Sequence, residues 1–262
     1  MSSNQPIISI DIGTCSTVCC YSKRRQRLHL QYSGKDWNIP TTVATIDGEV
    51  VFGYDCMRSD KKKENIFVSD IKSIMGLRYK DHKGYSGRIT PYGLSGDLFP
   101  QMTFINPRIA ISPQYVLALF LWNLRQQEQL RRRKNYDIIL TVPALADASQ
   151  LHAYKEAVEL AGFTLIGFVP EPIAAAISFG QQEAEFEHLL VYDLGGSTFD
   201  VSLLERNTQE EYAIITSLQH PTLGGIQIDY CLLEYVYTYI GRIEGGRERR
   251  NVRGYESNER GS

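Results

Sequence analysis

The sequence predicts an α/β protein of two lobes in which the same hairpin occurs twice. Residues 8–18 and 191–201 each contain an apolar run that ends in Asp-x-Gly, followed by small residues and a second β-branched run. This pattern is typical of two strands joined by a tight glycine turn, with a carboxylate where the turn begins. Between the two copies, strand and helix patterns alternate over residues 113–180, which is typical of a sheet covered by helices.

The bulk composition is that of an ordinary globular chain and excludes some functions. The 262 residues are 43% hydrophobic and 22% charged, which leaves room for one large domain or two smaller ones. The net charge of −2 argues against nucleic acid as a partner. No apolar run approaches the roughly 20 residues that span a bilayer, and the N-terminus lacks the features of a secretory signal. The five cysteines have no regular spacing, so we expect reduced thiols in a cytoplasmic protein.

The N-terminal part is predicted to consist mainly of strands. The apolar segments 7–12, 17–22 and 28–32 are expected to form a meander. About residues 34–111 contain many Gly, Asp and Lys residues and no long helical period. We therefore expect a smaller inserted subdomain of short strands there, with one helix near residues 69–75.

A regular alternation of helix and strand follows. Ser112 and Pro113 predict the N-cap and first residue of one helix, and Asp147 predicts the cap of another, which Gly162 closes. The basic run at residues 131–134 would complement the dipole of the first helix at its end. The predicted elements are a helix from residue 113 to that basic run, a strand at 138–142, a helix at 148–161, a strand at 165–169 and a helix at 173–179.

The C-terminal part contains the second hairpin and ends in polar sequence. The hairpin at 188–205 is followed by a strand at 212–217 and a helix from about residue 228 to 239. The residues after 240 include too few apolar side chains to offset the entropy of ordering them, so we expect disorder. The predicted domains are a first lobe at 1–187, a partial second lobe at 188–240 and a disordered tail at 241–262.

The two glycine turns are the first candidate site. Gly13, Gly195 and Gly196 permit turns whose backbone N–H groups approach a phosphate, because glycine places no Cβ in the way. Asp11 and Asp193 would face a shared cleft, where carboxylates can orient the waters of Mg²⁺. For either copy alone, an ordinary hairpin with an Asp-Gly turn is the alternative. The pair together favours a two-lobed nucleotide clamp.

Further residues could act on a phosphate bound in such a clamp. Lys72 could neutralise charge on a transferring phosphoryl group, although its residue type alone fits a solvated helix lysine better. Glu171 lies where a strand ends and a helix begins. It could orient a water, or it could simply be an acidic residue that the helix dipole favours at the start of the helix. Thr198 and Asp200 could contact a γ-phosphate and metal-bound waters. Gly224-Gly225 could be a third phosphate turn or an ordinary turn before a helix.

These residues carry a resemblance to a known family. Over about residues 7–240, the chain resembles the nucleotide-binding domain of the 70-kDa heat-shock chaperones, the DnaK family. The order and spacing of the motifs make the resemblance specific, above all the block Gly-Gly-x-Thr-Phe-Asp-Val-Ser. The matching segments are residues 10–14, 70–76, 141–144, 171–176, 192–202 and 223–225.

The resemblance implies a fold, ligands and residue roles. The implied fold is the actin-like (ribonuclease H-like) ATPase core, with the first lobe complete and the second partial. The implied ligands are ATP or ADP between the lobes and Mg²⁺, whose waters Asp11 and Asp193 would hold. The implied catalytic residues are Lys72, Glu171, Thr198 and Asp200. The implied phosphate-binding residues are Gly13, Thr14, Cys15, Gly195, Gly196, Ser197, Thr198, Gly224 and Gly225.

The chain also departs from the family pattern. Cys15 stands where the family usually has Thr, and Ser197 stands where it usually has Gly. If the turn needs positive φ at residue 197, Ser197 stores strain of order 1 kcal/mol or more. Ile226-Gln227 replaces an acidic pair, and Leu151 replaces an arginine. The chain stops where the family inserts its adenosine-gripping segments, so we expect an incomplete second sheet that exposes an apolar edge.

Two functional hypotheses follow from the resemblance. The first is an ATP-binding heat-shock-chaperone-like protein that acts in protein folding and the stress response, with ATP hydrolysis left open. The alternative is a non-catalytic truncated relative that binds co-chaperones or other chaperone chains through its first lobe. A sugar or acetate kinase ranks lower, because the sequence shows no separate signature for a phosphate acceptor. A fragment that does not fold well is a further alternative, since the sequence changes abruptly after Ile240.

Overall fold

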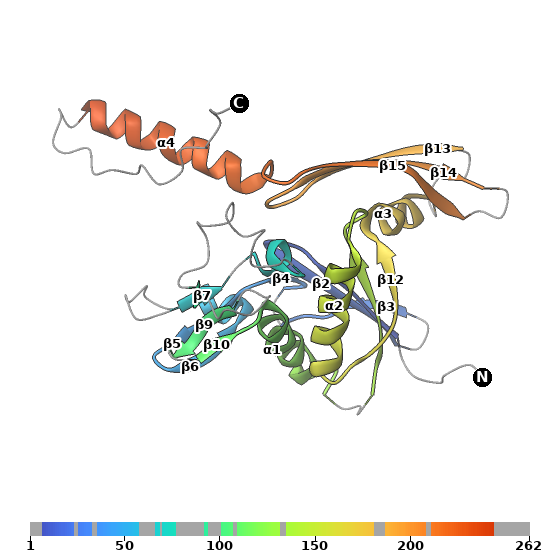
Figure 1. The fold of residues 1–262 in the computed structure, drawn as a ribbon, viewed down its shortest axis with the longest axis horizontal. Helices are drawn as coiled ribbons and strands as arrows, with labels where there is room; N and C mark the ends of the chain where they lie inside the picture. Colours follow the sequence, from blue (N-terminus) through green and yellow to red (C-terminus); the bar gives the residue numbers. More distant parts are fainter. Residues whose placement is uncertain are drawn as a thin grey trace.

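The structure, a computed structural model, describes residues 7–23, 26–32, 36–57, 66–68, 70–76, 92–93, 101–106, 109–131, 135–180, 187–207 and 211–243. The strands are β1 (Ile7–Ile12), β2 (Ser16–Lys23), β3 (Gln26–His29), β4 (Asn38–Pro40), β5 (Val43–Ile46), β6 (Glu49–Phe52), β7 (Ile66–Val68), β8 (Tyr92–Gly93), β9 (Gln101–Asn106), β10 (Ile109–Ile111), β11 (Asp137–Val142), β12 (Thr164–Pro170), β13 (His188–Leu194), β14 (Phe199–Arg206) and β15 (Tyr212–His220). The helices are α1 (Pro113–Gln126), α2 (Ala148–Leu160), α3 (Glu171–Gly180), α4 (Gly225–Ile243) and the 3-10 helices η1 (Gly53–Met57) and η2 (Ile71–Ile74). Figure 1 shows their arrangement.

The largest sheet is mixed, and β1 lies near its middle. Its strand order is β12-β11-β1-β2-β3, with β4 also paired to β2. β1 runs parallel to β11 and antiparallel to β2. Alternation along β1 places Ile8, Ile10 and Ile12 in the core, where they share one apolar cluster with side chains of α1 and α2. The predicted α/β class and the meander are confirmed, although the third strand ends at His29.

The helices of this layer begin largely as predicted. Pro113 follows the N-cap residue Ser112 at the start of α1. Asp147 caps α2 in a capping box with Gln150, and Gly162 follows that helix with a φ of +79°. The position of the basic run is a correction, because α1 ends at Gln126 and Arg131 lies in a later turn. Residues 132–134 lie outside the described part of the chain.

The region predicted as an insertion contains short strands, as expected. β5, β6 and β7 form one small sheet, and β8, β9 and β10 form another. Two details differ from the prediction. β4 lies within the predicted insertion but pairs with β2 of the main sheet, and the helix expected near residues 69–75 is the 3-10 helix η2.

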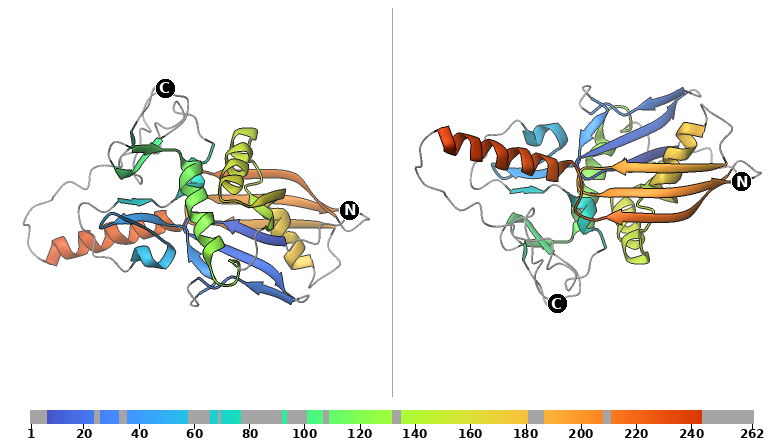
Figure 2. Two further views of the ribbon diagram at one scale, coloured as in Figure 1. Left: turned by 90° about the horizontal axis from the view of Figure 1, so that it is seen from below. Right: turned by 90° about the horizontal axis from the view of Figure 1, so that it is seen from above.

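The second hairpin and β15 form a separate three-stranded antiparallel sheet. It lies beside α3, as Figures 1 and 2 show. Its outer face is apolar and exposed, with Leu190 at 63%, Tyr192 at 68% and Leu218 at 73% exposure. The prediction was an exposed apolar edge, whereas these side chains form an exposed face of the sheet. α4 extends beyond the end of the sheet to Ile243, and the remainder of the predicted disordered tail lies outside the described residues. None of the helices in the described segments is long and apolar enough to cross a membrane.

Candidate functional site

The two glycine turns are closed by the same hydrogen bond. In the first hairpin the Gly13 N–H donates to the Ser16 carbonyl at 2.9 Å, and in the second the Gly195 N–H donates to the Thr198 carbonyl at 2.9 Å. The backbone N–H groups of these two glycines therefore already have hydrogen-bond acceptors within their own turns. Hydrogen bonds to a phosphate would have to come from other groups of each turn.

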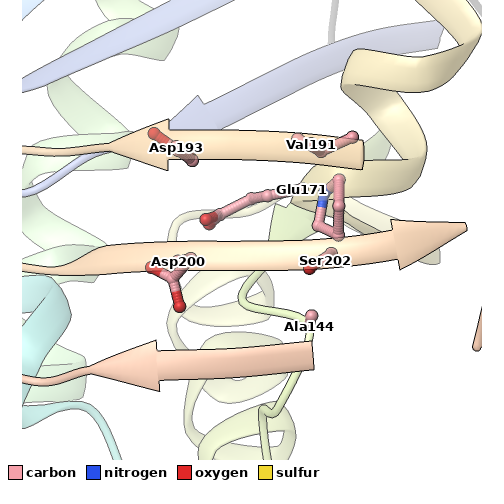
Figure 3. A pocket seen from close by; sticks show the side chains of 7 residues that line it. Ala144, Glu171, Val191, Asp193, Asp200 and Ser202 are labelled. Atoms are coloured by element: carbon pink, nitrogen blue, oxygen red, sulfur yellow. The ribbon is translucent and has the colours of Figure 1, made fainter. Parts of the chain in front are cut away.

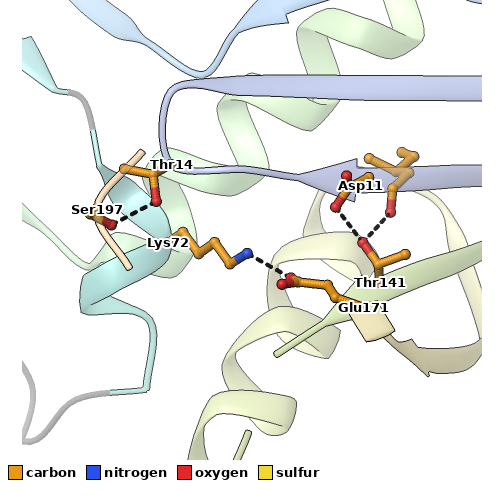
Figure 4. A network of polar contacts seen from close by, with 7 residues as sticks. Asp11, Thr14, Lys72, Thr141, Glu171 and Ser197 are labelled. Atoms are coloured by element: carbon orange, nitrogen blue, oxygen red, sulfur yellow. Dashed lines mark hydrogen bonds and ion pairs between the residues drawn. The ribbon is translucent and has the colours of Figure 1, made fainter. Parts of the chain in front are cut away.

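The two turns lie in direct contact. The hydroxyls of Thr14 and Ser197 are 2.8 Å apart and buried, as Figure 4 shows. A Cβ added at Gly196 would lie 2.4 Å from the Cys15 sulfur, so the second turn closely approaches the Cys15 side chain of the first. The strain considered for Ser197 is absent, because only Asp47 and Asp70 have positive φ among the described residues other than glycine.

The third glycine turn packs against the second. A Cβ on Gly224 would lie 2.7 Å from backbone atoms of Gly196 and Ser197. The N–H groups of Gly225 and Ile226 donate to the carbonyls of Gly195 and Gly196, both at 2.9 Å. The start of α4 is therefore bonded to the second hairpin turn, which in turn contacts the first, so the three predicted glycine turns lie in one connected group.

Lys72 lies on η2 and pairs with Glu171. Its Nζ is 2.6 Å from Oε1 of Glu171, and each side chain is only 16% exposed. Gly76 holds this segment against α2, since its φ is +71° and a Cβ there would lie 2.5 Å from the Gln150 nitrogen. The Ser149 hydroxyl also donates to the Gly76 carbonyl at 2.9 Å. The alternative of a solvated helix lysine is therefore wrong.

The pKa of Glu171 is influenced by carboxylates from both hairpins. It follows β12 at the first position of α3. Burial raises the pKa of its carboxyl above the ordinary value, the Lys72 ammonium opposes this rise, and the carboxylates of Asp11 and Asp193 add to it. One acidic residue from each hairpin therefore lies close enough to influence the same glutamate.

The remaining carboxylates surround a small pocket. Asp193 and Asp200 are directly opposite on β13 and β14, and Glu171 extends toward them in Figure 3. Burial is the largest influence on the carboxyl of Asp200 and raises its pKa, and the nearby carboxylate of Asp193 raises it further. A hydrogen bond from Thr198, the Lys72 ammonium and a hydrogen bond from Gln219 lower this pKa and so oppose the rise. The pocket is lined by Ala144, Glu171, Pro172, Val191, Asp193, Asp200 and Ser202.

One side chain of the site had no predicted role. The Thr141 hydroxyl on β11 donates to Oδ1 of Asp11 at 2.6 Å and so fixes that carboxylate. Its position in the motif at residues 141–144 was the available signal. The contact itself depends on the parallel pairing of β1 with β11, which the local sequence does not specify.

The donor set fits magnesium held through water. Asp11 and Asp193 offer exposed carboxylate oxygens, which are the ligands that Mg²⁺ prefers. Within the described residues, no three His, Cys, Asp or Glu side chains are grouped so that they could hold a metal ion. Mg²⁺ usually keeps several waters and binds through one or two carboxylates and substrate phosphates, so two carboxylates suit it.

The fold and the site together define an α/β domain with a candidate phosphate site between two hairpins. A protein-family model described as Hsp70 protein matches residues 7–254. This match covers most of the chain, which therefore belongs to the Hsp70 family, as a nucleotide-binding domain. The family has the actin-like ATPase fold, an ATP-binding chaperone function, and ATP or ADP with Mg²⁺ as ligands.

Proposed function

We propose that this chain binds Mg-ATP where the three glycine turns meet and hydrolyses it to ADP and phosphate to drive protein folding. The Lys72–Glu171 pair carries the proposal, because it places a cation and a carboxylate beside the acidic residues of both hairpins. In this proposal the first lobe spans residues 1–187 and the second begins at residue 188. Co-chaperones are the proposed partners, and the cytoplasm and the stress response are the proposed setting.

In the proposed reaction, each of the catalytic side chains has a separate role. The Lys72 ammonium binds the oxygens of the transferring phosphoryl group and offsets the charge that builds there. Glu171, released from Lys72 by the competing phosphate, accepts a hydrogen bond from the attacking water and orients it. Thr198 and Asp200 hold the surrounding phosphate oxygen and metal waters. When bound at Asp11 and Asp193, Mg²⁺ would supply charge neutralisation for the phosphates.

A second candidate function rests on the exposed apolar side chains of β13–β15 and α4. Large contiguous apolar surfaces are typical of protein-binding sites. Tyr192, Tyr235 and Tyr237 are each more than 60% exposed. A non-catalytic module that binds chaperone partners through this surface, rather than through the first lobe, is therefore the alternative, and it requires neither Lys72 nor Glu171.

Turnover of ATP by the Lys72→Met variant separates the two functions. Removing the cation should lower the single-turnover rate about 100-fold, the size expected for one group that stabilises the transition state. Lys155→Met is the matched control, since Lys155 is 56% exposed and pairs with Glu159 within α2. Its rate should match that of the unmodified chain. Equal rates for Lys72→Met and the unmodified chain would contradict catalysis through Lys72.

The pH dependence of turnover tests the role of Glu171. The carboxylate is the active form, and it is lost as the pH falls through a pKa raised above 4.5. Turnover should therefore begin to fall at a higher pH than an ordinary glutamate would give. Glu171→Gln should lower the rate and remove this limb of the profile. A Glu171→Gln variant with an unchanged rate and profile would contradict the proposed role.

A further inference from the structure

One contact at the site depends on a residue in which this chain departs from its family. Ser197 replaces the usual glycine, and its hydroxyl lies 2.8 Å from the Thr14 hydroxyl on the other hairpin. Thr14 is 8% and Ser197 is 6% exposed, so both are covered. A glycine at position 197 would have no hydroxyl to offer. The hydrogen bond between the two turns is therefore a property of this sequence.

This bond joins the two turns between which the proposed function places a polyphosphate. The adjacent residues Cys15 and Gly196 are also in close contact, and α4 begins against the same turn. A phosphate placed between the two turns has to separate the Thr14 and Ser197 hydroxyls. The Thr14 hydroxyl would then exchange its Ser197 partner for the phosphate, so the bond that is lost reduces the net gain from binding.

We propose that Ser197 is a specificity-determining residue that weakens polyphosphate binding by holding the Thr14 hydroxyl of the other turn in a hydrogen bond. The proposal rests on the proposed nucleotide site between the turns. Its chemical content is a competition for the single Thr14 hydroxyl proton, which is donated either to the Ser197 oxygen or to a phosphate oxygen. Removing the Ser197 hydroxyl leaves Thr14 available to the phosphate without a prior bond to break.

The direct test is calorimetric titration of Mg-ATP into the unmodified chain, Ser197→Ala and Ser197→Gly. Both variants should bind Mg-ATP about fivefold more tightly, as expected for one net hydrogen bond that no longer has to be broken. Tyr136→Phe is the matched control. It removes a buried hydroxyl that donates to the Leu130 carbonyl at 2.9 Å, at the end of β11 opposite to the glycine turns, and it should leave the Mg-ATP affinity unchanged.

A thermal denaturation cycle without nucleotide tests the bond itself. Thr14→Val and Ser197→Ala should each lower the melting temperature, and the double variant should lose less than the sum of the two, since both changes remove the same bond. Additive losses would overturn the proposal, because they would mean that the two hydroxyls do not interact.

The binding outcomes distinguish this proposal from the proposed function. Mg-ATP binding with equal or weaker affinity in Ser197→Ala would overturn the role of Ser197 and leave the nucleotide site intact. Binding by the variants but not by the unmodified chain would support the role of Ser197 strongly. No Mg-ATP binding by any variant, at concentrations where an Hsp70-family chain used as a positive control is saturated, would overturn the nucleotide site and this proposal with it.

Discussion

The β1–β2 and β13–β14 hairpins have the same turn and opposite surroundings. The closing hydrogen bonds of their turns have the same length of 2.9 Å. The residue before the acidic position is Ile10 in the first hairpin, where it is 1% exposed, and Tyr192 in the second, where it is 68% exposed. The comparison shows that the local sequence determines the turn, whereas the neighbouring elements determine which side chains are buried.

The difference in burial follows from the position of each hairpin in its sheet. β1 is flanked by β11 and β2, and one face of it packs against α1 and α2. β13 is an edge strand of its sheet within the described residues, and the face that carries Leu190 and Tyr192 is exposed. The opposite face of β13 contributes Val191 and Asp193 to the pocket. Only one face of β13 therefore contributes side chains to the pocket, and its other face is exposed.

The largest expected effect comes from truncating the equivalent residue of each hairpin. Ile10→Ala removes a fully packed side chain and should lower the free energy of unfolding by about 2–5 kcal/mol. Tyr192→Ala should cost about 1 kcal/mol, because it loses mainly its ring contact with Phe199, whose centroid is 4.5 Å away. Urea denaturation of the two variants measures both values. Equal losses would contradict the contrast in burial.

A smaller effect is expected from adding a Cβ to the equivalent glycine of each turn. In Gly13→Ala the new atom would lie 2.5 Å from the Ser16 carbonyl oxygen, whereas in Gly195→Ala it would lie 3.3 Å from the Thr198 carbonyl oxygen. Gly13→Ala should therefore lower the free energy of unfolding by about 1–3 kcal/mol, as overpacking does, and Gly195→Ala by less than about 1 kcal/mol. The melting temperatures of the two variants give this order. A greater loss in Gly195→Ala would mean that the turns differ in the opposite sense.

Much of the local structure could be predicted from the sequence. The two hairpins, the Pro113 start of α1 and the Asp147 cap of α2 depend on residues within a few positions of one another, so their patterns are visible in the chain. The end of α1 was less predictable. The helix ends at Gln126 although helix-forming residues continue beyond it, because propensity is a weak constraint compared with packing.

The site could be predicted only in part. Glycines and acidic residues identified the turns, but residue type favoured a solvated Lys72, whereas its partner is Glu171, 99 positions away. The pairing of Thr141 with Asp11 and of Thr14 with Ser197 spans 130 and 183 positions. Such contacts depend on how sheets and helices pack, and no local pattern specifies that packing.

Hydrogen–deuterium exchange with and without Mg-ATP tests the central claim most directly, because it reports on both turns in one experiment. If the turns form one phosphate site, Mg-ATP should slow exchange together in segments 13–17, 195–199 and 223–226, while the C-terminal half of α2 stays unchanged. Slower exchange in only one hairpin, or in neither, would contradict the claim that the two turns form a single site.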